Sequence, residues 1–391
     1  MTVPIIVSFI IATLVPLLFL YIVHALDVYG TDAFGVILLS FVWGIVCVGF
    51  AFVINNYIGN NFMQDLSGRE RVSMIIRYWA PIVEEILKAV IFLYLIRRSD
   101  FTYFVDGAIY GFAIGIGFAV AENYYYLNTH PDAGLSLAIT RVLSTNLMHA
   151  VATGLSGIAI GRARFARFSG RFIALSLGLI LAILFHMGFN NLVDRSTSSL
   201  LFIYATVGGF IGLGGIAWAI RQGLKAEAEW IKEKQEELIS QNRLSSKEAN
   251  ATQNLGDIEL YVEPLVDIIG REKVDQMIEL VTIQARLGIN RKSRDQLTDD
   301  KLRQKFDKQI ADLDAKMNAL RAEIGPYAMT YFRISFPDDI ELWDRLEKSV
   351  TAISNAPKKA GGFDLFAAMG QRSANLPAEP KEENTQIKEE G

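Results

Sequence analysis

Long runs of apolar residues fill positions 1–221 of this 391-residue chain, and charged sequence replaces them in 222–391. A membrane-spanning helix needs about 20 apolar residues. The stretches that reach this length are 3–24, 33–54, 73–96, 103–127, 138–160, 172–194 and 199–220. The pattern therefore predicts an all-α, polytopic helical membrane protein with about seven transmembrane helices, and assigns 1–221 to a membrane domain.

The basic residues of the short loops predict the orientation, because cytoplasmic loops carry an excess of Lys and Arg. They lie after the third, fifth and seventh stretches: Arg97, Arg98, Arg162, Arg164, Arg167, Arg171, Arg221 and Lys225. We therefore expect an N-terminus outside and a C-terminus in the cytoplasm.

Composition adds little to the functional interpretation. The net charge of −4 averages two unlike regions, and the one cysteine, Cys47, excludes an internal disulfide.

The region after residue 221 has a helical pattern of its own. We expect a charged helix and linker over 222–254, a helical cytoplasmic domain over 255–354 and a disordered tail over 355–391. Within the domain, helical periodicity covers 257–269, 272–287, 296–323 and 339–354. In 296–323 apolar residues recur mostly at threes and fours, which favours a helical hairpin or short coiled coil. This domain either only folds or provides a surface for a protein partner or self-association. No nucleic-acid-binding motif is present.

Ionisable and amide side chains interrupt four of the apolar stretches. They are Glu84, Glu85 and Lys88 in the third, Glu122 and Asn123 in the fourth, His149 in the fifth, and His186 and Asn190 in the sixth. A charged group at bilayer depth costs at least ~2.5 kcal/mol, so such residues are usually functional. With ~1.5 Å rise per residue, Glu84, His149, His186 and Glu122 all fall in the outer half or at the midplane. We therefore expect them to form one site that opens outward.

Activation of water is the chemistry that this set allows. A carboxylate can take a proton from water as a general base, and histidines can stabilise an oxyanion, relay a proton or bind a metal. The amide of Asn190 can donate to a developing oxyanion. We expect Glu84, Glu85, Glu122, His149, His186 and Asn190 to be catalytic, and Lys88 and Asn123 to support them. Whether Glu84 or Glu85 is the base stays open.

The order of these motifs resembles the PrsW family of membrane-embedded proteases, which is more distantly similar to the CAAX prenyl proteases. The motifs are Glu84-Glu85-x-x-Lys88, Gly117-Phe118-Ala119-x-x-Glu122-Asn123-x-x-Tyr126, His149 with Gly154 and Gly157, and His186-x-x-x-Asn190. The resemblance covers about 73–194 and extends loosely over 1–221.

The resemblance implies hydrolysis of a membrane-anchored protein, such as an anti-sigma factor, near the outer face of a bacterial cytoplasmic membrane. It leaves a glutamic and a metal-dependent enzyme open. A divalent metal such as zinc would be held by His149, His186 and Glu122, and the chain has no HExxH motif.

Other interpretations remain for the same residues. Glu85 and Lys88 can form a structural ion pair, Glu122 with Asn123 can cross-link helices, and either histidine can be a hydrogen-bonded core residue. The protein as a whole can instead be a non-catalytic scaffold or a proton-coupled transporter. Arg141 and Arg77 lie near the outer ends of spans, where arginines snorkel towards water.

Small residues repeat every fourth position in the fourth stretch, at Gly107, Gly111 and Gly115. This spacing is typical of helices that approach each other closely in lipid. We expect it to serve helix packing.

Overall fold

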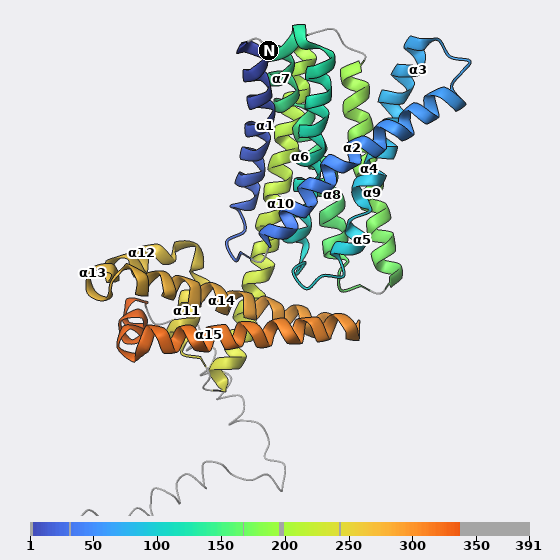
Figure 1. Ribbon diagram of the computed structural model, residues 1–391. Helices are drawn as coiled ribbons and strands as arrows, with labels where there is room; N and C mark the ends of the chain where they lie inside the picture. Colours follow the sequence, from blue (N-terminus) through green and yellow to red (C-terminus); the bar gives the residue numbers. More distant parts are fainter. Residues whose placement is uncertain (1–2, 31–32, 167, 195–198, 242–243, 337–391) are drawn as a thin grey trace, which may run out of the picture. The chain divides into compact units, whose positions relative to one another are not determined.

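The computed structural model describes residues 3–30, 33–166, 168–194, 199–241 and 244–336 (Figure 1). Every regular element in these ranges is helical, which confirms the all-α prediction. The α-helices are α1 (Val3–His24), α2 (Phe34–Phe62), α3 (Gly68–Met74), α4 (Ala80–Ala89), α5 (Phe92–Leu95), α6 (Phe104–Thr129), α7 (Gly134–Leu143), α8 (Thr145–Arg162), α9 (Phe168–Asp194), α10 (Ser199–Ser240), α11 (Ser246–Gln253), α12 (Ile258–Val262), α13 (Val266–Ile269), α14 (Arg271–Gln296) and α15 (Asp300–Ser335). The predicted helix 339–354 and the predicted tail 355–391 lie outside the described residues.

Five helices in the described part of the chain, α1, α2, α6, α9 and α10, are long and apolar enough to cross a membrane. They coincide with five of the predicted spans. The protein is thus an integral membrane protein with several helical spans.

The other two predicted spans, 73–96 and 138–160, are not continuous helices. The first contains a π-helical segment, Ile75–Trp79, between α3 and α4. The second is broken at Ser144, whose φ of −124° and ψ of −72° are not helical. Both breaks belong to the stretches that carry Glu84, Glu85 and His149, and π-helical turns are frequent at functional sites.

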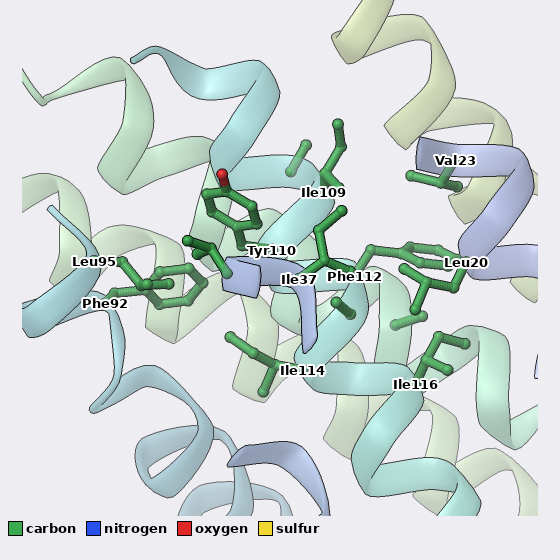
Figure 2. Close-up of a cluster of buried hydrophobic side chains, with 14 of the residues drawn as sticks. Leu20, Val23, Ile37, Phe92, Leu95, Ile109, Tyr110, Phe112, Ile114 and Ile116 are labelled. Atoms are coloured by element: carbon green, nitrogen blue, oxygen red, sulfur yellow. The ribbon is translucent and has the colours of Figure 1, made fainter. Parts of the chain in front are cut away.

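Helix α6 is the centre of the membrane domain, because 94% of its apolar window is buried, against 22% in α1 and 17% in α9. Figure 2 shows part of the core around it, where Ile109, Phe112 and Ile116 of α6 lie among side chains of α1, α2 and the α5 segment. The low burial of α1 and α9 leaves apolar faces that suit contact with lipid.

The glycine repeat of α6 lies against α8, as the sequence predicts. A Cβ built on Gly107, Gly111 or Gly115 would lie 2.2–2.6 Å from the backbone oxygens of Gly157, Thr153 and His149 respectively. A side chain at any of the three positions would therefore push α8 away. The repeat sets the close distance at which α8 presents its polar residues to α6.

Helix α10 continues without a break from the last predicted span into the predicted charged helix. Helices α14 and α15 then form the predicted hairpin, with α10 and α11 packed against α14.

Residues 246–253 were predicted as a linker but form α11, which begins at the capping hydroxyl of Ser245. Polarity misled the sequence analysis here, because Glu248 of α11 is buried by ion pairs and not by apolar contacts. The domain boundaries themselves stay a prediction.

One of the basic loop residues used to predict the orientation is not exposed to solvent. Arg164, after α8, is 0% exposed and donates hydrogen bonds to the backbone oxygens of Ile96 and Arg98. Burial lowers the pKa of its guanidinium to about 9. Arg164 therefore ties two loops together at the end of the membrane domain from which α10 continues.

Candidate active site

The carboxylates of α4 lie inside the membrane domain with Lys88. Glu84 is 8% exposed, Glu85 1% and Lys88 0%. Lys88 Nζ donates to Glu85 Oε1 at 2.8 Å, and its ammonium lies 3.9 Å from the centre of the Phe118 ring. The pair follows from the spacing of three residues, which places both side chains on one helix face.

Helix α8 meets this pair through two side chains. Lys88 Nζ lies 3.0 Å from His149 Nδ1, and Thr153 Oγ1 donates to Glu85 Oε2 at 3.0 Å. An ammonium can only donate, so His149 Nδ1 accepts the hydrogen bond. His149 Nε2 is then directed towards Glu122 Oε2 of α6, 2.9 Å away.

Helix α9 contributes His186. Its Nδ1 lies 3.0 Å from Glu85 Oε1, and its Nε2 lies 3.9 Å from Glu84 Oε2. The His186 and His149 rings stand almost perpendicular with centroids 4.8 Å apart. Because the Glu85 carboxylate accepts from Nδ1, the lone pair of His186 Nε2 points to the side where Glu84 lies.

The two adjacent glutamates have different surroundings. Both oxygens of Glu85 are occupied, by Lys88, His186 and Thr153. Glu84 Oε2 is buried and has no hydrogen-bond partner among the residues that the structure describes. A buried polar atom without a partner is rare enough in proteins to require an explanation, such as an absent ion.

Glu84, His149 and His186 are close enough to bind one metal ion, since their ligand atoms all lie within 4.8 Å of one another. Two histidines and one carboxylate are a common ligand set of catalytic zinc, which leaves a fourth position for water or substrate. The hydrogen bond from His186 to Glu85 is the second contact that metal-binding histidines usually make. The residues therefore fit a divalent metal, with Glu84 in the place that the sequence analysis gave to Glu122.

Six of the predicted residues thus come together, and two take other partners. The six are Glu84, Glu85, Lys88, Glu122, His149 and His186. Asn190 Nδ2 donates to the backbone oxygen of Ile76, inside the π-helical segment. Asn123 Nδ2 donates to Asn146 Oδ1, and its Oδ1 accepts from Arg141, which also binds Glu122. In this structure both amides connect helices.

The sequence analysis missed Arg141, which was assigned to the membrane surface. Arg141 is 9% exposed and binds Glu122 Oε2 at 2.7 Å, so it does not snorkel. Charge balance could have revealed it. Three carboxylates lie within the predicted spans near one lysine, and a second cation at similar depth was to be expected.

The chain is similar to known proteins over the region that contains the site. The model of a family described as "PrsW family intramembrane metalloprotease" matches residues 32–214, which contain every residue of the site. "Protease PrsW" of Bacillus subtilis (strain 168) is 30% identical over 165 residues, 41% of this chain and 70% of that protein. "Protease PrsW" of Shouchella clausii (strain KSM-K16) is 28% identical over 196 residues, 48% of this chain and 84% of that protein. No solved structure matches the chain. The coverage and identity of the Bacillus subtilis relative show that this chain belongs to the PrsW family of intramembrane proteases.

Proposed function

We propose that this chain hydrolyses peptide bonds of single-span, membrane-anchored proteins with a divalent metal held by Glu84, His149 and His186. The observation that carries the proposal is the buried, unpartnered Glu84 Oε2, which lies 3.9 Å from His186 Nε2. Glu84 Oε2 and His186 Nε2 therefore lie near each other with no hydrogen bond between them in the described structure. A metal ion there would satisfy both.

When bound, a divalent metal such as zinc supplies Lewis-acid polarisation of the peptide carbonyl and of the attacking water. Glu122 is the carboxylate next to the triad, with Oε2 2.9 Å from His149 Nε2. Because Nδ1 of His149 is held by Lys88, Nε2 is the nitrogen that would bind the metal, and it would give up its hydrogen bond to Glu122 to do so. We assign it the role of general base. It accepts a proton from the water whose oxygen attacks the carbonyl carbon, and it returns a proton to the amine nitrogen as the C–N bond breaks.

Glu85 and Lys88 support this chemistry without taking part in proton transfer. Glu85 orients His186 through Nδ1, and Lys88 neutralises Glu85 and fixes His149 through Nδ1. The difference between the two neighbouring glutamates supports these roles, because both oxygens of Glu85 have partners and Glu84 Oε2 has none in the described structure. In the alternative without a metal, Glu84 is the base.

The position of the site supports a membrane-anchored substrate that is cut at one face of the membrane. Glu122, His149 and His186 lie near the end of α6, the start of α8 and the end of α9, so they share one end of the membrane domain. This is the end opposite to the continuation of α10. In the predicted orientation it is the outer side, which suits cleavage of a membrane-anchored protein there, with an anti-sigma factor as the candidate from the family resemblance.

A chelator experiment tests the metal. The protein is reconstituted in vesicles with a single-span substrate, and cleavage is followed before and after removal of divalent metal. We expect activity to fall to the background and to return when zinc is added, but not when magnesium is added, because histidine ligands favour zinc. His186→Ala should not recover. Full activity after complete metal removal would rule out the metal and favour Glu84 as base.

A further inference from the structure

Arg141 of α7 contacts three residues near the end of α6 with one side chain. Its Nη2 donates to Glu122 Oε2 at 2.7 Å, and its Nε donates to Asn123 Oδ1 at 2.8 Å. The guanidinium carbon lies 4.1 Å from the centre of the Tyr126 ring. Only 11% of the Arg141 side chain is exposed. The planar guanidinium is thus fixed by two directed hydrogen bonds and a ring face, a geometry that lysine cannot reproduce.

The break between α7 and α8 permits this contact. In one straight helix, Arg141 and His149 would lie about 12 Å apart along the axis. In the structure the helix ends at Leu143 and begins again at Thr145. As a result Arg141 and His149 both reach the same oxygen, Glu122 Oε2, at 2.7 and 2.9 Å.

Arg141 is the cation that contacts Glu122 in the described structure, at 2.7 Å. Lys88 is engaged by Glu85 and His149 and makes no hydrogen bond to Glu122 in the same residues. Asn123 extends the support, since its Nδ2 donates to Asn146 Oδ1 of α8 at 3.0 Å.

We propose that Arg141 is a positioning residue for peptide hydrolysis, which holds the Glu122 carboxylate directed at the Glu84–His149–His186 triad. The inference rests on the proposed function, in which Glu122 is the general base. It differs from a purely structural role, in which Arg141 would only tie α7 to α6. The two roles predict different kinetics.

A double-mutant cycle separates them. Cleavage of a single-span substrate in vesicles is measured for the wild type, Arg141→Gln, Glu122→Gln, the double variant and Arg141→Lys. Cobalt(II) is added to each variant, and its visible absorption reports the ligand set independently of activity. Arg162→Gln is the matched control, because Arg162 also stacks on an aromatic ring, Phe104 at 4.7 Å, but lies at the other end of α8.

We expect Arg141→Gln to lower kcat on the order of 10²-fold, the loss typical of a misplaced catalytic group, with little change in KM and an unchanged cobalt spectrum. Arg141→Lys should lie between Arg141→Gln and the wild type. The double variant should be no slower than Glu122→Gln, because Arg141 acts through Glu122. Arg162→Gln should cleave like the wild type.

Three results would overturn the inference: wild-type kcat in Arg141→Gln, losses that multiply in the double variant, or loss of the cobalt spectrum in Arg141→Gln. If Arg141→Gln does not accumulate, Arg141→Lys alone and combined with Glu122→Gln gives the same cycle. Failure of the proposed function can be told apart from failure of this inference. A wild type that cleaves without metal and gives no cobalt spectrum contradicts the metal. The double-mutant cycle still reports whether Arg141 and Glu122 are coupled.

Discussion

Two buried glutamates, Glu84 in the membrane domain and Glu248 in the C-terminal helical region, differ in how their oxygens are satisfied. Glu248 Oε1 accepts from Arg333 at 2.7 and 3.0 Å, and Glu248 Oε2 accepts from Arg321 at 2.5 Å. Its side chain is 2% exposed. Glu84 is buried to a similar degree, yet its Oε2 has no partner in the described structure.

Under the proposed function, the comparison separates a structural carboxylate from one that would bind a metal. The two guanidinium groups around Glu248 neutralise it and join α11 to α15. Glu84 instead lies beside two imidazoles, and its ligand atom and theirs fall within 4.8 Å of one another. Burial alone does not mark a functional residue, whereas burial with an unsatisfied oxygen beside further ligands does.

The largest expected effect comes from neutralising Glu84 and Glu248, each in a separate variant. Glu84→Gln should lower cleavage at least about 10²-fold, more than the loss of an outer-shell partner of a metal ligand, while thermal stability stays close to the wild type. Glu248→Gln should do the opposite, lowering the free energy of unfolding of the helical region by ~1–3 kcal/mol with unchanged cleavage per folded molecule. Vesicle cleavage and thermal unfolding of both variants check this. An equal loss of activity in the Glu84 and Glu248 variants would contradict the difference between the two glutamates.

Substitution of Glu85 should lower both cleavage and the free energy of unfolding. Glu85→Gln leaves Lys88 buried without its carboxylate, which typically costs ~3–5 kcal/mol when a buried pair is broken. It also replaces the charged acceptor of His186 Nδ1 by a neutral amide, so activity should fall ~10–100-fold. The double variant Glu85→Gln with Lys88→Met removes the unpaired charge. It should regain stability but not activity, and recovery of both would show that Glu85 serves only as a partner of Lys88.

A smaller effect is expected from the glycine contact that holds α6 against α8. In Gly115→Ala the new Cβ would lie 2.4 Å from the backbone oxygen of His149, so α8 must move. Overpacking of this kind costs ~1–3 kcal/mol, and we expect reduced cleavage because His149 moves with it. The control is Gly214→Ala in α10, where a Cβ meets nothing within 4 Å. If Gly115→Ala is as stable and active as Gly214→Ala, the contact does not set the site.

Much of the fold and the site could be predicted from the sequence, because apolar length and misplaced charges are local signals. The long spans, the α14–α15 hairpin and the glycine contact were all visible in spacing. The π-helical segment Ile75–Trp79 had a signal that the prediction did not use, since Pro81 just after it lacks an N–H. The break at Ser144 was not visible, because no proline or glycine marks it. The role of Arg141 was missed for the same reason, because its contact with Glu122 depends on that break.

The unbroken α10 has a mechanical consequence. A helix of 42 residues rises roughly 63 Å, about twice the ~30 Å of a hydrocarbon core. Its first half therefore belongs to the bilayer and its second half to the helical region, with no loop between them to absorb a rotation. A rotation of one half about the helix axis therefore also rotates the other half, unlike in a flexible linker.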